Sequence, residues 1–380
     1  MSQIKNIKNL RVLQIVPELK FGGVERGVVD ILRFLNKRKI ENYVFCENFN
    51  PNIIKSYEKK QVFSLKNLKF KNFFKFFRLN DELKKLINKK KINLIHISSR
   101  APAFIFYNLI KKNKKILYIT SYHSPYSGHY LKKFYNSFLC KGNKIICNSN
   151  FTKKSLQNNY NISDNKLVTI PRGIDFNYFN PNSLNVKTRD IYRSKLGILK
   201  SQILIIIPSR FSNWKGHLQL ILFLKNQPRP ILKRIKLLMF LNDDNKIEKK
   251  NILKISGETF YNKIIFHNPS PNMRLIYHCS DITVNNSSKP EGFGRTISET
   301  LAMNKIPIGV NHGGVKEQLY FFDKKLLYNL NDQLSFNKAL KYAIYLTSKR
   351  NFKGREYVVK NYSLNSMLNS TLDVYLNGQQ

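Results

Sequence analysis

The sequence predicts an α/β protein with two doubly wound domains, each a parallel sheet that helices cover on both faces. The chain has 380 residues, which is too long for one ordinary core and suits two domains of similar size. Hydrophobic residues make up 42% and aromatic residues 13% of the sequence, enough for a folded core. Short apolar runs alternate throughout with segments of helical periodicity, as parallel sheets with crossover helices require.

The first half of the chain opens with an apolar run at Leu10–Pro17, which we expect to be a strand. The next segment has apolar residues at helical spacing, namely Val24, Val28, Ile31, Leu32 and Leu35. Further strands are predicted at Tyr43–Cys46, Val62–Leu65, Leu94–Ile97, Ile116–Thr120, Lys144–Asn148 and Leu167–Pro171.

The second half repeats this pattern. Its strands are predicted at Ile203–Pro208, Lys236–Leu241, Ile264–His267, Asp281–Asn285, Ile306–Val310 and Lys325–Asn329. The segment Asn177–Lys200 lacks a strand pattern and is rich in Asn, Ser, Pro and Lys, so we expect the passage between the domains there. We divide the chain into a first domain at 1–180, a second at 181–355 and a terminal helical segment at 356–380 that crosses back to the first domain.

Several features predict a cytoplasmic protein. Met1–Leu10 is polar and lacks the apolar region of a signal peptide. No run approaches the roughly 18 apolar residues of a membrane span. The four cysteines form no CxxC pair, and nothing in their spacing indicates a disulfide framework or a zinc site. We therefore expect no metal ligands and a reducing compartment.

The charge is strongly positive: 66 Lys and Arg against 23 Asp and Glu give a net charge of +43. Such an excess attracts polyanions, which include nucleic acid, anionic lipid and phosphorylated substrates. A bias toward Lys, Asn and Ile in the composition explains most of the charge equally well. A nucleic-acid-binding protein is one alternative, but no zinc pattern, RNP-like aromatic motif or helix-turn-helix is recognisable, so we expect no nucleic-acid partner.

The loop Glu18–Glu25 joins the first predicted strand to the first helix. Its adjacent Gly22 and Gly23 let the backbone approach a ligand and leave amides free at a helix N-terminus, where an anion is favoured. The loop matches neither a P-loop nor the dinucleotide-binding GxGxxG pattern. A plain tight turn would explain the two glycines equally well.

The segment Lys289–Glu299 is the strongest candidate for a binding site. It follows a predicted strand, opens a helix and carries two carboxylates, Glu291 and Glu299, which suit hydrogen bonds from sugar hydroxyls. Gly292 and Gly294 keep side chains away from a ligand and leave the amides of Phe293 and Gly294 free. Both glutamates also fit the capping-box pattern, as Ser288-x-x-Glu291 and Thr296-x-x-Glu299, so helix capping is an equal alternative.

Two further loops follow predicted strands. In Pro208–His217, Arg210 and Lys215 are suited to clamp a diphosphate, since one offers a planar fork and the other a point charge. Trp214 between them fits a core or hinge aromatic as well. His123 also follows a strand, and it is equally a structural or a catalytic histidine.

Together these segments resemble family four of the retaining glycosyltransferases, which have the GT-B fold, two Rossmann-like domains that face each other across a cleft. The Glu-Gly-Phe-Gly motif with its second glutamate is specific, whereas the Gly-Gly loops are not. The tail Tyr362–Tyr375 is similar to the closing helix of that family. The resemblance runs in order through most of the chain, at Phe21–Glu25, Pro171–Asp175, Phe179, Pro181, Arg210, Lys215–Gly216, Glu291–Glu299 and Gly313–Glu317.

The resemblance implies that the first domain binds an acceptor and the second a nucleotide sugar. Glu291 would hold hydroxyls of the donor sugar and Glu299 the ribose. The amides of Phe293 and Gly294 would bind the sugar or a phosphate.

The same resemblance implies how the reaction is catalysed. Arg210 and Lys215 would neutralise the diphosphate leaving group, and the amides of Gly22 and Gly23 would reach the same diphosphate. His123 matches a histidine near the anomeric centre. Stabilisation of the leaving group would carry much of the catalysis, with retained anomeric configuration, a UDP- or GDP-sugar as the donor, and neither a cofactor nor a metal ion.

The sequence also departs from the family pattern. Arg172 stands where Asn is common, and Lys236–Asn245 lacks the usual glycines. His267–Pro269 replaces a glycine-bearing loop that helps to frame the base, while Asn304 replaces a glycine in a way that Asn tolerates. These departures leave the nucleobase of the donor open.

Two basic stretches rich in aromatic residues, Lys69–Leu79 and Lys132–Lys144, suit docking on the anionic inner face of the cytoplasmic membrane. The alternative is that their aromatic residues belong to the core. Docking would fit a lipid-linked or lipopolysaccharide-type acceptor. A nucleotide-sugar epimerase or a phosphorylase of the same fold remains an alternative activity, and the sugar, the linkage and the oligomeric state stay open.

Overall fold

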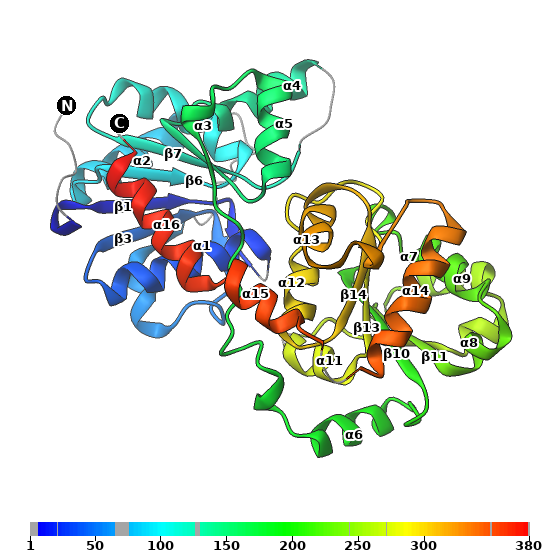
Figure 1. The fold of residues 1–380 in the computed structure, drawn as a ribbon. Helices are drawn as coiled ribbons and strands as arrows, with labels where there is room; N and C mark the ends of the chain where they lie inside the picture. Colours follow the sequence, from blue (N-terminus) through cyan, green and yellow to red (C-terminus); the bar gives the residue numbers. More distant parts are fainter. Residues whose placement is uncertain are drawn as a thin grey trace. The chain divides into compact units, whose positions relative to one another are not determined.

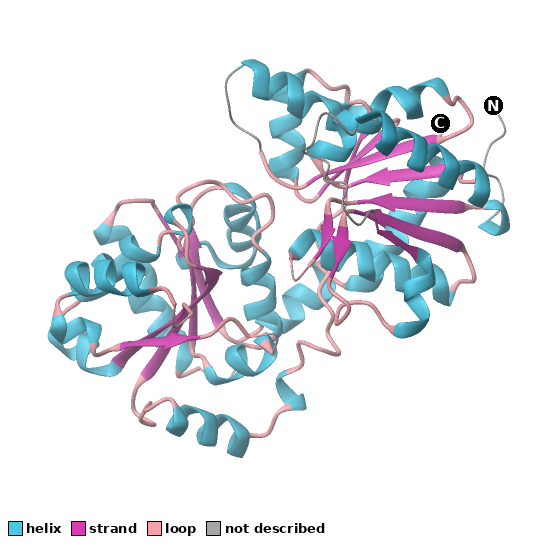
Figure 2. Cartoon of the chain, turned by 180° about the vertical axis from the view of Figure 1, so that it is seen from behind, coloured by secondary structure: helices cyan, strands magenta, loops and turns pink. Residues whose placement is uncertain are grey.

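The computed structural model describes residues 7–20, 22–64, 76–125, 130–242, 244–270, 272–349 and 352–378. The chain divides into two compact units. Unit 1 comprises Met1–Gly173 and Asn365–Gln380, and unit 2 comprises Ile174–Leu364. Each unit is built on a parallel sheet with helices on its faces (Figure 1, Figure 2), so the predicted α/β class with two doubly wound domains is confirmed.

The sheet of unit 1 runs in the order β5-β3-β1-β6-β7-β8-β9, and all of these pairings are parallel. The order steps outward from β1 in both directions, which sends the crossover helices to both faces. The central strands are buried over their whole length, as expected for a sheet covered on both sides. Their bounds are Arg11–Ile15 (β1), Glu41–Cys46 (β3), Val62–Ser64 (β5), Leu94–Ile97 (β6), Leu117–Tyr122 (β7), Lys144–Cys147 (β8) and Leu167–Thr169 (β9).

The longer helices of unit 1, such as α1 and α2, bury an apolar stripe, whereas α4 buries only Asn136. In α1, the buried residues include Val28, Leu32 and Leu35, as the helical spacing predicts. A short parallel pair, β2 (Glu18–Leu19) with β4 (Asn48–Phe49), was not predicted because two residues carry no periodicity. The helices are α1 (Gly23–Lys37), α2 (Phe76–Lys90), α3 (Arg100–Lys112), α4 (Tyr130–Ser137), α5 (Asn150–Tyr160) and α16 (Leu364–Asn377).

The sheet of unit 2 runs in the order β12-β11-β10-β13-β14-β15, again with parallel pairings. Each strand coincides with a predicted apolar run to within a few residues. The bounds are Ile203–Arg210 (β10), Ile235–Phe240 (β11), Ile264–His267 (β12), Ile282–Asn285 (β13), Ile306–Val310 (β14) and Leu327–Tyr328 (β15). The helices are α6 (Val186–Lys195), α7 (His217–Lys225), α8 (Arg229–Arg234), α9 (Lys246–Ser256), α10 (Glu258–Tyr261), α11 (Met273–Cys279), α12 (Arg295–Ala302), α13 (Gly313–Asp323), α14 (Gln333–Thr347) and α15 (Gly354–Asn361).

The division into units differs from the predicted ranges. The chain leaves unit 1 after Gly173 rather than at residue 180, and the segment Asn177–Lys200 lies wholly within unit 2. Its helix α6 is fastened there because Arg193 and Arg189 each place a guanidinium nitrogen 2.8 Å from the carboxylate of Asp281. The terminal segment also divides, since α15 packs on α12 in unit 2 while most of α16 belongs to unit 1.

The basic, phenylalanine-rich stretch predicted at 69–79 is only partly described. Residues 69–75 lie outside the described residues, and the rest forms the first turn of α2, in which Phe77 is 82% exposed. Within the described ranges, no helix combines the length and the hydropathy that a bilayer span requires.

Candidate active site

The loop between β13 and α12 places Glu291 at the carboxyl end of the unit 2 sheet, beside the loop that follows β10. Lys215 Nζ lies 2.7 Å from Glu291 Oε1, and Asn285 Nδ2 donates to the same oxygen at 3.1 Å. The hydroxyl of Ser287 donates to Oε1 as well. All three bonds reach one oxygen, so the other oxygen, Oε2, is the one placed to accept a hydroxyl of a ligand.

Glu291 is ionised in this setting. Burial alone would raise its pKa, but Lys215 and the hydrogen bonds from Ser287 and Asn285 hold the pKa below its ordinary value. The side chains of Lys215 and Glu291 are only 20% and 14% exposed. Glu291 is therefore a hydrogen-bond acceptor at neutral pH and not a proton donor.

Lys215 is held between two loops. It ends a short 3-10 turn, and its ammonium lies 4.1 Å from the ring centroid of Trp214. Gly216 follows with a φ of +72°, and a Cβ there would collide with the carbonyl of Asn286. The amide of Asn286 instead donates to the carbonyl of Gly216 at 2.6 Å. Only glycine permits both the backbone conformation and this close approach.

Arg210 does not join this cluster. It is the last residue of β10, beyond an irregularity in the pairing with β11, and its side chain is exposed. Among the described residues, no hydrogen bond or ion pair to the side chain of Arg210 is found. A joint clamp of Arg210 and Lys215 on a diphosphate therefore stays a prediction, with Arg210 as an uncommitted cation at the same end of the sheet.

Glu299 lies in the second turn of α12 and is oriented from two sides. Arg295 Nη2 is 3.1 Å from Oε1, and the hydroxyl of Tyr277 donates to Oε2 at 2.9 Å. Tyr277 is fully buried, and burial followed by the charge of Glu299 raises its pKa well above the ordinary value. The phenol therefore remains a donor that fixes the carboxylate.

The capping alternative for the two glutamates does not describe the structure. The N-cap residue of α12 is Gly294, which has a φ of +84° and no side-chain bond, and Thr296 lies inside the helix. The loop before the helix is held by Gln318, whose amide donates to the carbonyls of Phe293 and Gly294. Among the described residues, no hydrogen bond donated by the amides of Phe293 and Gly294 is found, and their binding of a ligand stays a prediction.

Gly22 and Gly23 begin α1 in unit 1, as the sequence predicts. Gly22 is the N-cap residue, with no side-chain bond to the first turn. A Cβ on Gly22 would collide with the carboxylate of Glu25, which folds back over the start of the helix. The carboxylate of Glu25 thus lies at the positive end of the helix dipole, where a negative charge is favoured.

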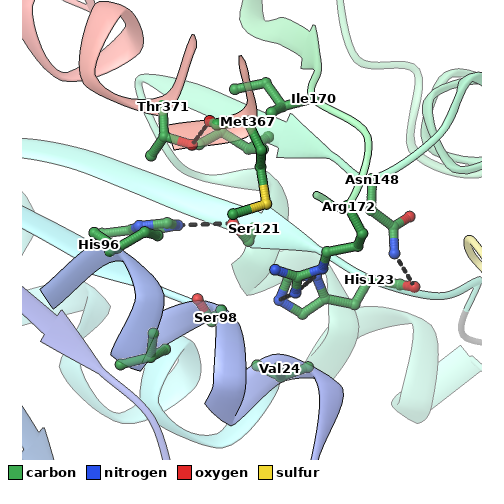
Figure 3. Close-up of a pocket in the computed structure, with 14 residues that line it drawn as sticks. Val24, His96, Ser98, Ser121, His123, Asn148, Ile170, Arg172, Met367 and Thr371 are labelled. Carbon is green, nitrogen blue, oxygen red and sulfur yellow. Dashed lines mark hydrogen bonds between the residues drawn. The ribbon is translucent and has the colours of Figure 1, made fainter. Parts of the chain in front are cut away.

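His123 follows β7 and lines a small cavity of unit 1 (Figure 3). Arg172 Nη2 lies 3.0 Å from Nδ1 and 3.4 Å from Nε2 of His123, and the side-chain amide of Asn148 donates to the His123 carbonyl at 2.8 Å. Burial first, and then the charge of Arg172, lower the pKa of His123 well below its ordinary value. His123 is therefore neutral at physiological pH.

A second histidine, His96, lies in the same cavity. Its Nδ1 is 2.7 Å from the hydroxyl of Tyr375 in α16, and its Nε2 is 2.7 Å from Ser121 Oγ in β7. Burial lowers the pKa of His96 to about 3, with a further contribution from Arg172. His96 thus ties the end of the chain to the sheet as a neutral group.

The structure joins one pair of the predicted site residues directly, Lys215 with Glu291 in unit 2. Lys215, Glu291 and Glu299 gather at the carboxyl end of the unit 2 sheet together with the glycine-containing loop at 292–294, whereas Arg210 stands apart. Gly22, Gly23 and His123 lie in unit 1. Sequence reasoning missed the side chains that orient these groups, although Arg172 was marked by its departure from the family pattern. The missed groups are His96, Tyr277, Asn285, Ser287, Arg295 and Tyr375. Among the described residues, no group of three or more metal-ligating side chains is found.

Two parallel-sheet units, with a lysine–glutamate pair and a second oriented carboxylate at the sheet end, define a glycosyltransferase of the GT-B type. Residues 21–178 match the sequence profile of Glycosyltransferase Family 4, and residues 188–357 match that of Glycosyl transferases group 1. The chain belongs to this family-4 group of GT-B glycosyltransferases.

Solved structures support this assignment. A glycosyltransferase from Rickettsia africae ESF-5 is 28% identical, with a TM-score of 0.85 over 98% of this chain and 99% of that chain. Anabaena Alr3699/HepE in complex with UDP is 16% identical, with a TM-score of 0.78 over 96% and 99%. WaaG, a glycosyltransferase involved in lipopolysaccharide biosynthesis, is 12% identical, with a TM-score of 0.73 over 96% and 99%. The latter two share the fold. No curated protein sequence matches the chain.

Proposed function

We propose that the protein is a retaining glycosyltransferase that moves a hexose-type sugar from a UDP- or GDP-linked donor to a cell-envelope glycan or a lipid-linked acceptor. The observation that carries the donor side of this proposal is the pair Lys215–Glu291 beside the oriented carboxylate of Glu299 in unit 2. A cation for phosphate and two acceptors for hydroxyls are the groups that a nucleotide sugar needs.

In the proposed complex, Glu299 accepts hydrogen bonds from the ribose, and Glu291 Oε2 accepts one from the sugar. The diphosphate draws Lys215 and the exposed Arg210 to itself, while the amides of Phe293 and Gly294 donate to the sugar or a phosphate. Negative charge grows on the diphosphate as the glycosidic bond breaks, and these fixed donors stabilise it. In this scheme, side-chain cations supply the positive charge, so the transfer needs no metal ion.

The nature of the substrates is proposed from relatives of the same fold. HepE was solved with UDP and with UDP-glucose, and WaaG is described as acting in lipopolysaccharide biosynthesis. These relatives favour a uridine or similar nucleotide donor and an acceptor of the lipopolysaccharide or exopolysaccharide type. In this scheme, unit 1 binds the acceptor.

A thermal-shift panel tests the donor side of the proposal. UDP-, GDP-, ADP- and CMP-linked sugars are added to the wild type, Arg210→Ala and Glu299→Ala. One nucleotide is expected to raise the melting temperature of the wild type, and both variants should weaken that shift. No shift with any nucleotide, in protein shown to be folded, would contradict the proposal.

We also propose that unit 1 docks on the anionic inner face of the cytoplasmic membrane through α4. Tyr130, Leu131 and Phe134 are 84%, 80% and 57% exposed, and the exposed Lys132 and Lys133 lie between them. Apolar and aromatic side chains that alternate with cations suit an interface with anionic headgroups. Docking there would bring the protein to a lipid-linked acceptor.

Flotation with vesicles of phosphatidylglycerol and phosphatidylcholine tests this docking. The wild type should float with these vesicles and not with phosphatidylcholine alone, and Leu131→Ser with Phe134→Ser should abolish flotation. A matched control is Tyr320→Ser with Phe321→Ser on α13 of unit 2, where the two rings are 56% and 72% exposed. Equal loss in both double variants would count against docking through α4.

A further inference from the structure

Unit 2 contains a cavity that is separate from its Lys215–Glu291 pair. It lies at the carboxyl end of the sheet, where α7 and α14 begin, and these two helices pack on each other (Figure 1). Its lining comes from the loop before α7, the first turn of α7 and the loops that follow β13 and β15, and includes none of Lys215, Glu291 and Glu299. The cavity measures about 270 Å³, close to the lower limit of roughly 300 Å³ for ligand pockets, so it suits a ligand the size of a single ring.

The described residues that line this cavity carry no charged side chain, although the chain has 66 Lys and Arg. His217 in its wall is buried and neutral, because burial lowers its pKa to about 4. The neighbouring cation in the sequence, Lys215, holds its ammonium 2.7 Å from Glu291 instead. A phosphate or a carboxylate would therefore find no counter-charge here, and the lining favours an uncharged ligand.

Three primary amides line the same cavity, those of Asn213, Gln219 and Asn331. Among the described residues, no hydrogen bond to any of these side chains is found. Each amide offers two N–H donors and one carbonyl oxygen, whereas a hydroxyl both donates and accepts. The hydroxyls around a sugar ring match such a mixed set of donors and acceptors. The ring of Phe211 and the side chain of Leu330 add apolar surface for the C–H groups of a sugar.

The walls of the cavity are fixed by hydrogen bonds. Asn286 Nδ2 donates to the carbonyl of Gly216 at 2.6 Å, and the hydroxyl of Tyr328 donates to Asn286 Oδ1 at 2.7 Å. The backbone amide of Ser288 donates to the carbonyl of Trp214 at 2.7 Å, which joins the loop after β13 to the loop before α7. Both loops are therefore in place before a ligand binds, and binding requires little further ordering.

We propose that this cavity binds one neutral sugar residue through Asn213, Gln219 and Asn331. The amides exchange hydrogen bonds with the ring hydroxyls, and Phe211 packs against the C–H face of the ring. The cavity is then a second carbohydrate site of unit 2, beside the one proposed for the donor sugar at Glu291. The binding is a property of unit 2 alone, whereas a role in holding a sugar of the acceptor or product glycan rests on the proposed function.

Trp214 can report on this site, because it is the one tryptophan of the chain, is 40% exposed and lies next to Asn213 in the sequence. Methyl glycosides of glucose, galactose and mannose are titrated while its fluorescence is followed, and saturation-transfer NMR records which sugar protons contact the protein. At least one glycoside should bind with a dissociation constant of about 1 mM, and glucuronate, a charged sugar, about tenfold more weakly. No binding of any of the three glycosides up to about 100 mM, or equal binding of glucuronate, would overturn the proposal.

Two variants remove an amide and preserve the shape of the wall. Gln219→Leu keeps the size of the side chain, and Asn331→Gly keeps the left-handed backbone, whose φ is +61°. Each should weaken glycoside binding about tenfold, the effect of one hydrogen bond. Asn161→Gly is the matched control, since Asn161 has a φ of +50° at the end of α5 in unit 1, and it should bind the glycoside as the wild type does. Equal affinities of the wild type and both folded cavity variants would overturn the proposal.

Nucleotides distinguish this cavity from the donor site in the wild type, even if neither cavity variant folds. UDP and GDP should leave the bound glycoside in place, and displacement by either nucleotide would overturn the proposal. A response to a glycoside without any response to nucleotide sugars would support the carbohydrate site and contradict the proposed transfer. A response to a nucleotide sugar without binding of any glycoside would do the reverse.

Discussion

Unit 2 sets each carboxylate of its candidate site against a cation, whereas the cavity of unit 1 is lined by two buried, neutral histidines. In unit 2, Glu291 is paired with Lys215 and Glu299 with Arg295. In unit 1, Arg172 faces two neutral histidines. Paired charges can exchange partners with an incoming diphosphate and sugar, while burial keeps the two histidines of unit 1 uncharged.

The largest effect is expected where a paired charge in unit 2 loses its partner. Lys215→Met leaves Glu291 partly buried without a counter-charge, which should reduce the free energy of unfolding by about 3 kcal/mol. Transfer should fall by about 10²–10³-fold, because a group that stabilises the leaving diphosphate is missing. Urea unfolding and initial rates measure the two effects.

A double variant sharpens this prediction. Adding Glu291→Gln to Lys215→Met should restore most of the stability and none of the activity, since the unpaired charge is gone. Lys341→Met, on the exposed side of α14, is the control for a lysine that pairs with no site residue. An unfolding free energy of Lys215→Met equal to that of the wild type would show that Lys215 does not compensate the charge of Glu291.

Glu299→Gln should weaken nucleotide binding by about tenfold to hundredfold, the range for hydrogen bonds to a charged group. The amide keeps the size of the side chain but leaves Arg295 without its carboxylate. Titration calorimetry with UDP and with GDP measures the change, and Glu356→Gln at an exposed position is the control. Equal affinities of the wild type and Glu299→Gln for the nucleotide would show that Glu299 does not bind it.

As the pH falls, the loss of unfolding free energy should begin with buried histidines such as those of unit 1. The pKa of His96 is lowered from 6.5 to about 3, so below pH 6.5 the unfolded chain binds a proton that the folded state refuses. Stability is therefore complete above that pH and falls below it, by at most about 1.4 kcal/mol per pH unit for each such histidine. His217 of unit 2, with a pKa lowered to about 4, shares this behaviour.

For Glu291 the pH window is different. Its pKa is lowered from 4.5, so its contribution is present above that value and is lost only as the pH falls further. Urea unfolding in steps from neutral to acidic pH separates the two windows. The unfolding free energy of His96→Gln should fall less steeply with decreasing pH than that of the wild type, because one histidine fewer takes up a proton on unfolding. An equal slope in both proteins would show that His96 does not contribute to the acid response.

The smallest effect is expected at Gly27. Alanine favours the interior of α1 by about 0.5–1 kcal/mol, but its Cβ displaces the Arg172 guanidinium, so the net change in stability should stay below about 1 kcal/mol. The environment of the His123 ring should nevertheless change, because the guanidinium that contacts it has moved. Thermal unfolding together with histidine NMR checks both parts, and a large loss of stability would show that Arg172 cannot move.

Local sequence patterns predicted the strands and the loops that follow them. Apolar runs such as Ile203–Pro208 and Ile306–Val310 became buried parallel strands because a sheet covered on both faces needs continuous hydrophobicity. Glu291, Glu299 and Lys215 were found because they follow strands, where the ligands of open sheets bind. The predicted boundary at residue 180 lies seven residues after Gly173, since the segment with α6 looks like a linker in sequence and is held in unit 2 by distant residues such as Asp281 and Cys279.

Contacts between distant segments were beyond local patterns. Tyr277 orients Glu299 from 22 residues away, and Tyr375 reaches His96 across 279 residues. Arg210 and Lys215 are close in sequence, yet the end of a strand and a 3-10 turn direct them differently. Such pairings depend on how elements pack, which residue types alone do not specify.

Because α16 belongs to unit 1, the order of synthesis determines which unit can complete its folding first. Residues 174–364 are synthesised between the two segments of unit 1, so unit 2 has its whole sequence available first. The position beside His96 that Tyr375 fills stays exposed to water until the last helix emerges from the ribosome. A premature stop near the end of the gene would therefore damage the unit encoded at its beginning.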